Sequence, residues 1–217
     1  MVTNKAVSLA DQVYERLEND IYSGKYKRGD IITEPAVCEE LGISRTPVHE
    51  AFGRLKYDHI VEEVSKGVVV LGVSPEDTKI IYSIRKQVEC MAAAGCAKNA
   101  TPAQLKELRD TVELQCFYSE KGHPEKVREC DSTFHRLLYK YSGSTIYYDV
   151  LEPLHKKIQK FREVSVSDRC RAEESNREHA AIVDAIAAGD EEAAARVTYE
   201  HICKAEEHIR KLIEEKE

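Results

Sequence analysis

The chain has 217 residues, which is enough for one large domain or two small ones, each with its own hydrophobic core. It carries 32 Lys and Arg residues against 39 Asp and Glu residues, a net charge of −7. Taken alone, that balance argues against a nucleic-acid-binding protein, because contacts with phosphate groups need positive charge. No stretch approaches the ~20 apolar residues of a membrane-spanning helix, and residues 1–10 do not form a secretory signal.

The seven cysteines point to a reducing compartment. Their number is odd, and no two of them form a Cys-x-x-Cys pair. This pattern excludes a zinc ribbon and disfavours a secreted disulfide framework. Glycine and proline are scarce, with 10 and 6 residues, and long stretches have apolar residues at helical spacing. These features predict a cytoplasmic, mostly helical protein.

The first 73 residues predict three helices followed by a β-hairpin. Apolar residues recur every four positions from Leu9, which indicates one face of a helix that Gly24 ends. Gly42 separates the second helix from the third, and Ser65-Lys66-Gly67 forms the hairpin turn. The expected helices cover residues 9–23, 35–41 and 44–57, and the expected strands cover residues 61–64 and 68–71.

Everything after residue 74 is expected to be helical. Ser74 and Pro75 form a strong helix start, so we place the domain boundary here, between domains 1–73 and 74–217. Short loops favour antiparallel neighbours, and Pro153 is expected to kink or split its helix. The expected helices cover residues 75–98, 102–121, 124–141, 145–166, 169–188 and 191–215. The predicted fold is mainly α, and its second domain is an antiparallel bundle of six to seven helices.

The second and third helices have the spacing of a helix-turn-helix. The third begins with Ser44-Arg45-Thr46-Pro47, which places hydroxyls, a guanidinium and free backbone N–H groups at the positive end of the helix dipole. Phosphate groups and guanine edges accept hydrogen bonds from such groups. Lys66 and Gly67 at the hairpin tip add a charge and let the backbone approach DNA. The alternative is a helical hairpin with a capped start and no DNA contact.

The motif continues as one specific run, Glu40-Leu41-Gly42-Ile43-Ser44-Arg45-Thr46-Pro47-Val48-His49-Glu50-Ala51, with Leu55 after it and Gly67 and Val69 in the hairpin. Over about residues 9–71 this pattern resembles the winged helix-turn-helix domain of the GntR family of bacterial transcription regulators. The resemblance implies a homodimer that binds a palindromic operator in double-stranded DNA. It implies DNA contacts from Ser44, Arg45, Thr46 and the Gly67 turn.

Two positions depart from that family pattern. His49 stands where the family usually has Arg, and Pro35 stands where many members carry a basic or polar residue. An arginine can bind guanine with two hydrogen bonds, whereas a histidine cannot do this in the same way and is mostly neutral at pH 7. We therefore expect an operator preference or an affinity that differs from the family norm, unless His49 makes no contact with DNA.

Four polar residues lie on the inward faces of three predicted helices. They are Asp131, His135, His179 and His201. The first two are one turn apart on the apolar face of helix 124–141, where an unpaired charge is costly. The last two lie about 15 Å and 18 Å of helical rise from the break at residues 189–190, so antiparallel packing brings them to similar heights. Three imidazoles and a carboxylate suit a divalent transition metal such as Zn, Ni, Mn or Fe.

The alternative for these residues is a set of separate core or surface histidines. The remaining histidines of the second domain receive no metal role in either interpretation. They are His123, His155 and His208.

The same residues carry a second resemblance. The pattern Asp131-x-x-x-His135, Glu178-His179-x-x-Ile182, Gly189-Asp190 and His201 is similar to the FCD effector domain of the FadR-like branch, over about residues 75–212. The resemblance implies a metal-binding bundle that senses a small organic acid and signals to the DNA-binding domain. It also implies that Arg85 lies in the effector pocket, where a guanidinium binds a carboxylate with two hydrogen bonds. The alternative for Arg85 is a salt bridge to Glu89.

These features predict a ligand-responsive, DNA-binding transcriptional regulator and not an enzyme. A metal-sensing regulator, in which the ion itself is the signal, shares every one of them. A helical metalloenzyme is the third hypothesis, but it lacks an obvious general acid or base near the ligands. Glu178, next to His179, points about 100° away from it on the helix.

The acidic charge is shared by both predicted domains. Residues 1–73 carry 9 basic and 12 acidic residues, a net of −3, and the remainder carries 23 and 27, a net of −4. Positive charge gathers only at the start of the third helix and at the hairpin tip. We therefore expect DNA binding that depends on a few well-placed contacts and on dimerisation, with weak non-specific attraction.

Overall fold

The computed structural model of the chain describes residues 8–158 and 168–214. The chain forms two compact units, Met1–Ser74 and Pro75–Glu217. The described helices include none that is both long enough and apolar enough to span a lipid bilayer.

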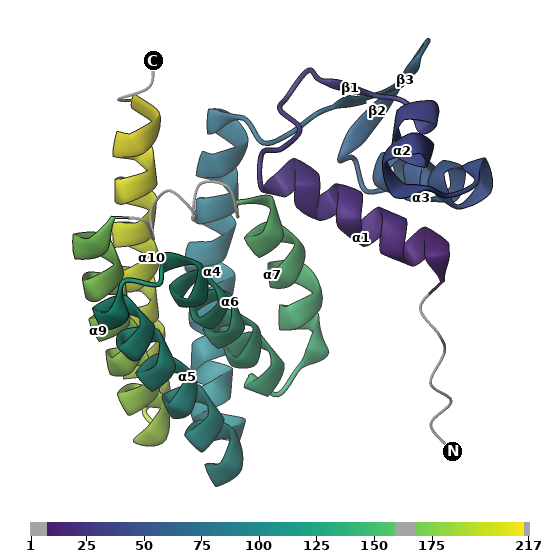
Figure 1. Ribbon diagram of the computed structural model, residues 1–217. Helices are drawn as coiled ribbons and strands as arrows, with labels where there is room; N and C mark the ends of the chain where they lie inside the picture. The colour runs from purple at the N-terminus through teal and green to yellow at the C-terminus, as the bar shows by residue number, and fades with distance from the viewer. Residues whose placement is uncertain (1–7, 159–167, 215–217) are drawn as a thin grey trace, which may run out of the picture. The chain divides into compact units, whose positions relative to one another are not determined.

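The N-terminal unit contains three helices and a three-stranded antiparallel sheet within its described residues (Figure 1). In chain order its elements are α1 (Leu9–Tyr22), β1 (Ile31–Ile32), α2 (Glu34–Leu41), α3 (Arg45–Tyr57), β2 (Val61–Val64) and β3 (Gly67–Val70). The strand order is β1-β3-β2, so the hairpin strand β3 lies in the middle. The predicted helix-turn-helix with a following hairpin is thus confirmed, and the sheet adds one strand to it.

Local signals set most of the boundaries in this unit. Ser8 caps α1 through a reciprocal hydrogen-bonded box with Asp11, and the Thr33 hydroxyl accepts from the backbone at the start of α2. Gly42 ends α2 in the left-handed conformation, with a φ of 65° that a glycine adopts without strain. Ser44 occupies the N-cap position of α3 as predicted, but its side chain does not make the capping hydrogen bond.

The sheet differs from the sequence prediction in two ways. Strand β1 was not predicted, because two residues are too few to show an alternating pattern and their pairing partner lies far along the chain. Strand β3 begins at Gly67, one residue earlier than expected, so that Gly67 pairs with Val64 and Val70 pairs with Val61. Buried side chains of α1, α3 and the sheet, among them Leu17, Phe52 and Val68, form the core of this unit.

The C-terminal unit is a helical bundle, as predicted, within residues 75–158 and 168–214. Its described helices are α4 (Pro75–Asn99), α5 (Pro102–Lys121), α6 (Pro124–Tyr141), α7 (Thr145–Lys157), α9 (Arg169–Ala187) and α10 (Glu191–Glu214). The helix expected over 145–166 ends at Lys157, and residues 159–167 lie outside the described residues. Pro153 does not split α7, because it lies inside one continuous helix.

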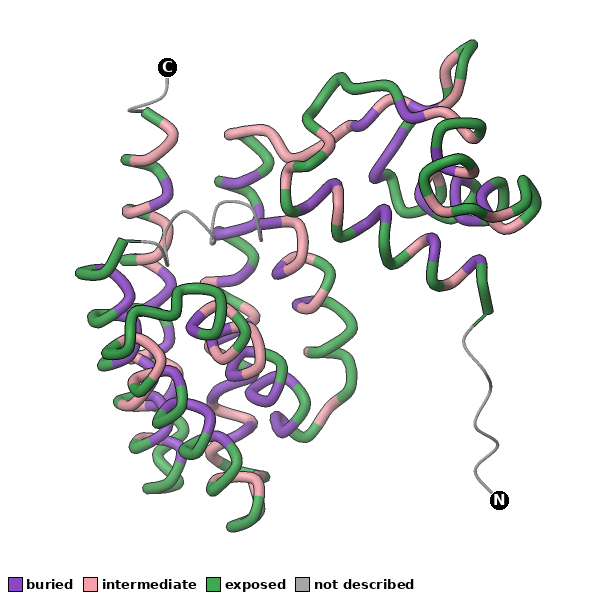
Figure 2. The backbone as a smooth tube through the Cα atoms, viewed as in Figure 1, coloured by how far each residue is buried: buried purple, intermediate pink, exposed green. Residues whose placement is uncertain are grey.

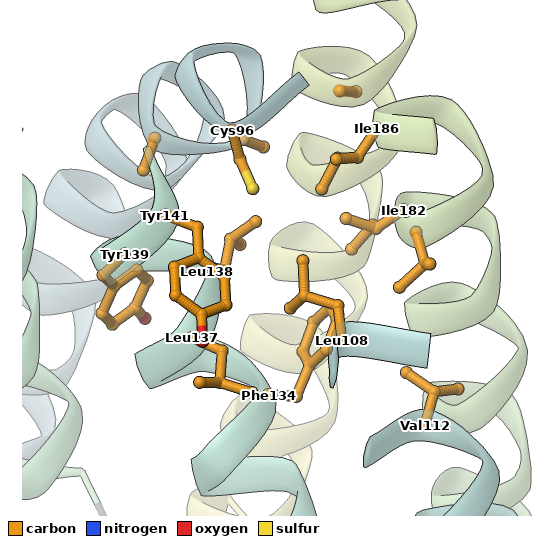
Figure 3. Packing of buried hydrophobic residues seen from close by; sticks show 14 of the residues in the cluster. Cys96, Leu108, Val112, Phe134, Leu137, Leu138, Tyr139, Tyr141, Ile182 and Ile186 are labelled. Atoms are coloured by element: carbon orange, nitrogen blue, oxygen red, sulfur yellow. The ribbon is translucent and has the colours of Figure 1, made fainter. Parts of the chain in front are cut away.

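The core of the bundle lies between α4, α5, α6 and α9. Side chains of these helices point toward one another around Phe134, Leu138 and Ile182 (Figure 3). Buried residues line the inward sides of the helices and exposed residues their outer sides (Figure 2). Helix α10 packs along α4 and against α9, which brings the inward faces of α6, α9 and α10 toward one region.

Candidate functional site

Three imidazoles meet in the interior of the helical unit. His135 comes from α6, His179 from α9 and His201 from α10, and each is at most 3% exposed. Their ring centroids are 4.7, 5.2 and 5.5 Å apart. One nitrogen of each ring lies within 4.8 Å of the other two. The fold therefore brings together three histidines that are separated by up to 66 residues in the sequence.

Asp131 lies at the same cluster, one turn before His135 on α6. It is 5% exposed, and its Oδ1 atom is 3.8 Å from Nε2 of His179. The ring of Phe134 stacks on the His179 imidazole with a centroid distance of 4.2 Å, which restricts the orientation of that ring. All four residues selected from the sequence thus lie in one buried group.

Two of the three histidines form a hydrogen bond through Nδ1 to a side-chain oxygen of a neighbouring helix. The pairs are His179–Gln115 at 2.9 Å and His201–Glu178 at 2.7 Å. Nδ1 of His135 lies 3.3 Å from Oε2 of Glu89 but forms no hydrogen bond with it. An oxygen that accepts from Nδ1–H leaves the lone pair of a neutral imidazole on Nε2. Metal-binding histidines are oriented in this way, by a hydrogen bond from the ring nitrogen that does not bind the ion.

Burial and charge favour a neutral imidazole at His201 and an ionised carboxylate at Glu178. Burial lowers the pKa of His201 to about 4, although the hydrogen bond to Glu178 opposes this shift. Burial by itself would raise the pKa of Glu178, but His201 and Arg171 together lower it to about 2. Neutral imidazole and ionised carboxylate are the forms that bind a metal ion.

The residues of this cluster fit a divalent transition metal ion. Three imidazole nitrogens and one carboxylate are the donor types that such ions prefer, at about 2.0–2.2 Å. The fit rests on the close approach of the three nitrogens and on the hydrogen bonds that orient His179 and His201. Such an ion, held by Asp131, His135, His179 and His201, would supply a Lewis acid with positions left for a ligand oxygen.

Arg85 and Glu89 form a buried ion pair one turn apart on α4. Their side chains are 2% and 0% exposed. Burial by itself would raise the pKa of Glu89, but Arg85 and then His135 hold it well below its ordinary value. The salt bridge given above as the alternative for Arg85 is therefore present. The same carboxylate contacts His135, so Glu89 connects Arg85 to the histidine cluster.

Two residues that the sequence analysis set aside also lie at this cluster. His155 of α7 received no role, yet it is 4% exposed and its ring centroid is 5.0 Å from that of His135. Burial lowers the pKa of His155 well below its ordinary value, which keeps the ring neutral. Glu178 points away from His179 on α9, as expected, but it contacts His201 of α10 instead. The period of one helix does not indicate which neighbouring helix a side chain will meet.

The predicted DNA-contacting residues of the N-terminal unit lie on its exposed surface. Ser44, Arg45, Thr46 and His49 at the start of α3 and Lys66 at the β2–β3 turn are all exposed. A cleft of about 460 Å³ separates the start of α3 from the β2–β3 turn, and Arg45, His49 and Lys66 line it. The helix and the hairpin therefore present their polar groups to one surface region.

Most cations of this unit are paired with carboxylates. Glu34 contacts both Arg45 and His49, Asp11 contacts Arg54, and Glu63 contacts Lys56. Lys27, Arg28 and Lys66, by contrast, form no ion pair with any residue in the described part of the chain. Lys66 is therefore an available cation at the hairpin tip.

Gly67 has a structural reason of its own to be glycine. Its φ of 139° is a conformation that side chains disfavour, and a Cβ atom at this position would lie 2.3 Å from the backbone oxygen of Ile32. The sequence pattern predicts a glycine here for close approach to DNA. The structure explains it by close approach of β1 to β3.

A helix-turn-helix followed by a small antiparallel sheet is the architecture of a DNA-binding domain. The buried histidine cluster belongs to the separate helical unit. Residues 9–70 match the family model of the bacterial regulatory proteins of the gntR family, and residues 80–203 match that of the FCD domain.

Individual proteins show the same similarity along nearly the whole chain. The HTH-type transcriptional repressor RspR of Escherichia coli K12 is 25% identical over 213 residues, covering 98% of this chain and 93% of RspR. The HTH-type transcriptional regulator McbR of the same strain is 31% identical over 151 residues, covering 69% and 68% of the two chains. The solved structure of E. coli McbR/YncC superposes with a TM-score of 0.83, at 25% identity, covering 96% of this chain and 100% of that one.

The chain belongs to the GntR family of bacterial regulators and carries an FCD domain after its helix-turn-helix. It is a DNA-binding transcriptional regulator. The family membership also confirms the prediction that the chain is not an enzyme.

Proposed function

We propose that this regulator is ligand-responsive and acts as a homodimer on a palindromic operator. In this proposal α3 and the β2–β3 turn contact DNA through Ser44, Arg45, Thr46, His49, Lys66 and Gly67. A divalent transition metal ion, bound by Asp131, His135, His179 and His201, provides part of the site for a small carboxylate effector. The observation that carries the proposal is the close approach of three buried imidazoles, two of which are oriented by a hydrogen bond at Nδ1, because this arrangement makes a preorganised donor set.

Arg85 supplies the second contact for the effector carboxylate in this proposal. Its Nε atom is already engaged by Glu89, so the remaining guanidinium nitrogens would bind the effector. Glu89 contacts both Arg85 and His135, so a ligand that displaces either side chain would also disturb the other. An effector acts on DNA binding only to the extent that it binds one conformation of the protein better than another.

A metal-sensing regulator is the second candidate. The observation that favours it is the buried Arg85–Glu89 ion pair, which already neutralises the charge of the guanidinium proposed to bind an effector. In that case the ion alone would change DNA binding, and organic acids would have no effect. The two candidates share the same metal-binding residues. They differ only in whether a small carboxylate effector binds as well.

Thermal-shift measurements on the full-length protein distinguish the candidates. The protein is first stripped of metal with a chelator and then loaded with Zn²⁺, Ni²⁺ or Mn²⁺, and a panel of small organic acids is added to each form. A ligand that binds only the folded state raises the melting temperature. We expect metal to raise it, and one class of acid to raise it further only in the metal-loaded protein. If metal alone alters operator binding and no acid does, the metal-sensing regulator is the correct function.

Two variants test the ligand assignment in the same assay. His179→Ala should lower the bound metal measured by elemental analysis and abolish the acid-dependent shift. His123→Ala replaces an exposed histidine outside the cluster and should change neither quantity. An unchanged metal stoichiometry in His179→Ala would contradict the assignment.

DNA binding is tested by mobility shift with the DNA upstream of the gene for this protein. We expect a specific complex whose affinity falls steeply with salt concentration. The absence of a specific complex at low and moderate salt, with and without metal, would contradict the proposed palindromic operator near this gene.

A further inference from the structure

The carboxylate of Glu34, at the start of α2, contacts two side chains of α3. One oxygen accepts a hydrogen bond from Nε of Arg45, and the other lies 2.7 Å from Nδ1 of His49. Glu34 itself is 14% exposed, whereas the side chains of Arg45 and His49 are 77% and 75% exposed. The largely buried carboxylate of Glu34 thus binds one nitrogen of Arg45 and one of His49, while the rest of both side chains is exposed to solvent.

This contact determines which nitrogen of His49 carries a proton. Hydrogen bonds from Arg45 and then from His49 lower the pKa of Glu34, so its carboxylate is ionised and can only accept hydrogen bonds. The Nδ1 atom of His49 must therefore be the donor. A neutral imidazole has a single N–H, so Nε2 of His49 then bears a lone pair and is a hydrogen-bond acceptor.

The position of His49 suits contact with a base edge. His49 lies one turn after Arg45, in the N-terminal part of the second helix of the helix-turn-helix. Residues in this part of the recognition helix reach base edges in the major groove. Because Nδ1 is occupied by Glu34, Nε2 is the ring nitrogen that remains for a base.

We infer that Glu34 and His49 together read a base that presents an amino group in the major groove, which is adenine or cytosine. The amino groups of adenine N6 and cytosine N4 are the hydrogen-bond donors on that edge, whereas guanine N7 and O6 and thymine O4 are acceptors. An acceptor at Nε2 therefore pairs with the amino groups of adenine and cytosine and is repelled by the acceptor atoms of guanine and thymine. An arginine at this position would select guanine instead. The inference rests on the proposed contact of α3 with DNA and specifies one position of the operator.

Selection from randomised double-stranded DNA tests this inference with the full-length protein. The selection is run at about pH 8, above the range in which an ordinary imidazole titrates. The wild type, His49→Ala and His49→Arg are compared. We expect one symmetric pair of operator positions at which the wild type selects adenine or cytosine, His49→Ala has no preference and His49→Arg selects guanine.

Base analogues test the same hydrogen bond in the selected operator. Purine in place of adenine, or 2-pyrimidinone in place of cytosine, removes only the amino group at that position. We expect the wild type to lose about five- to tenfold in affinity, in line with one lost base contact. His49→Ala should lose less than about twofold, because the partner of the amino group is already absent.

A third pair of variants tests the role of Glu34. Glu34→Ala frees His49 to adopt either tautomer, so the preference at this position should relax while the rest of the operator stays the same. Glu40→Ala removes another acidic side chain of α2, one that pairs with Lys25 instead, and should leave the preference unchanged. Circular dichroism confirms that each variant is folded.

Three results would overturn the inference. The first is that His49→Ala selects the same bases as the wild type at every operator position. The second is that the wild type selects guanine or thymine at the position that depends on His49. The third is that Glu34→Ala keeps the wild-type preference at that position. Each of these outcomes leaves the proposed regulator intact, because an enriched operator still appears. If no sequence is enriched by the wild type, the proposed operator binding and this inference fail together.

Discussion

The Nδ1 atom of His135 on α6 lies 3.3 Å from an oxygen of Glu89 on α4, in the interior of the helical unit. The same carboxylate forms a buried ion pair with Arg85. One carboxylate therefore lies beside a histidine proposed as a metal ligand and neutralises a buried cation. Loss of the Glu89 carboxylate should therefore affect the stability of the helical unit.

Glu89→Gln should destabilise the protein strongly. The substitution leaves Arg85 as a buried charge without a counter-ion, which costs about 3–5 kcal/mol. The double variant Arg85→Met, Glu89→Gln removes both charges and should recover much of this loss. Denaturant unfolding of metal-free protein measures the free energy of unfolding. The control is Asp110→Asn, which breaks the exposed pair Lys106–Asp110 and should leave the free energy of unfolding nearly unchanged. Equal effects of Glu89→Gln and Asp110→Asn would contradict the prediction.

Glu178→Gln should weaken metal binding without unfolding the protein. The Glu178 carboxylate accepts from Nδ1 of His201, and glutamine would keep an acceptor there but remove the negative charge that makes the imidazole a stronger donor to metal. Mutation of such a partner lowers metal affinity by about 10–100-fold. Competition with a chromophoric chelator measures the affinity. Glu174→Gln, an exposed residue one turn earlier on α9, is the matched control and should bind metal like the wild type. Equal affinities of the two variants would remove Glu178 from the site.

Lys66→Ala should weaken DNA binding to the same extent on every sequence. Lys66 is exposed at the β2–β3 turn and has no ion pair among the described residues, so it is available to a phosphate group. The slope of log Kobs against log salt concentration should become shallower by about 0.9 for each lost phosphate contact. Lys106→Ala, in α5 of the helical unit, serves as the control. A changed base preference in Lys66→Ala would show instead that this lysine reads a base.

Gly67→Ala and Gly53→Ala should have opposite effects on stability. At Gly67 the new Cβ atom would meet the backbone oxygen of Ile32 at 2.3 Å in a disfavoured backbone conformation, which costs about 1–3 kcal/mol. At Gly53, in the middle of α3, a Cβ atom would meet nothing within 4 Å beyond its chain neighbours and the backbone of its own helix, so the better helix propensity of alanine should stabilise the protein by about 0.8–1.0 kcal/mol. Thermal unfolding measures the effect of each substitution. If Gly53→Ala also destabilised the protein, α3 would not tolerate a side chain at position 53.

Local features of the sequence predicted most of the helices. The helix start at Ser74 and Pro75, the stop at Gly42 and the apolar period of α6 each act within one or two turns, so they can be recognised without a partner. The short strand β1 was missed, because its two residues form a strand only through pairing with β3. A strand has no local hydrogen bonds of its own.

The histidine cluster, too, was predicted in part from the sequence and in part only by the tertiary structure. The positions of Asp131, His135, His179 and His201 follow from helical period and loop length, so the sequence by itself predicted that they share an interior. Their partners do not follow, because Gln115 is 64 residues from His179 and Glu178 is 23 residues from His201. Which side chains meet depends on how each helix is rotated against its neighbours. Packing sets that rotation, and only the tertiary structure determines it.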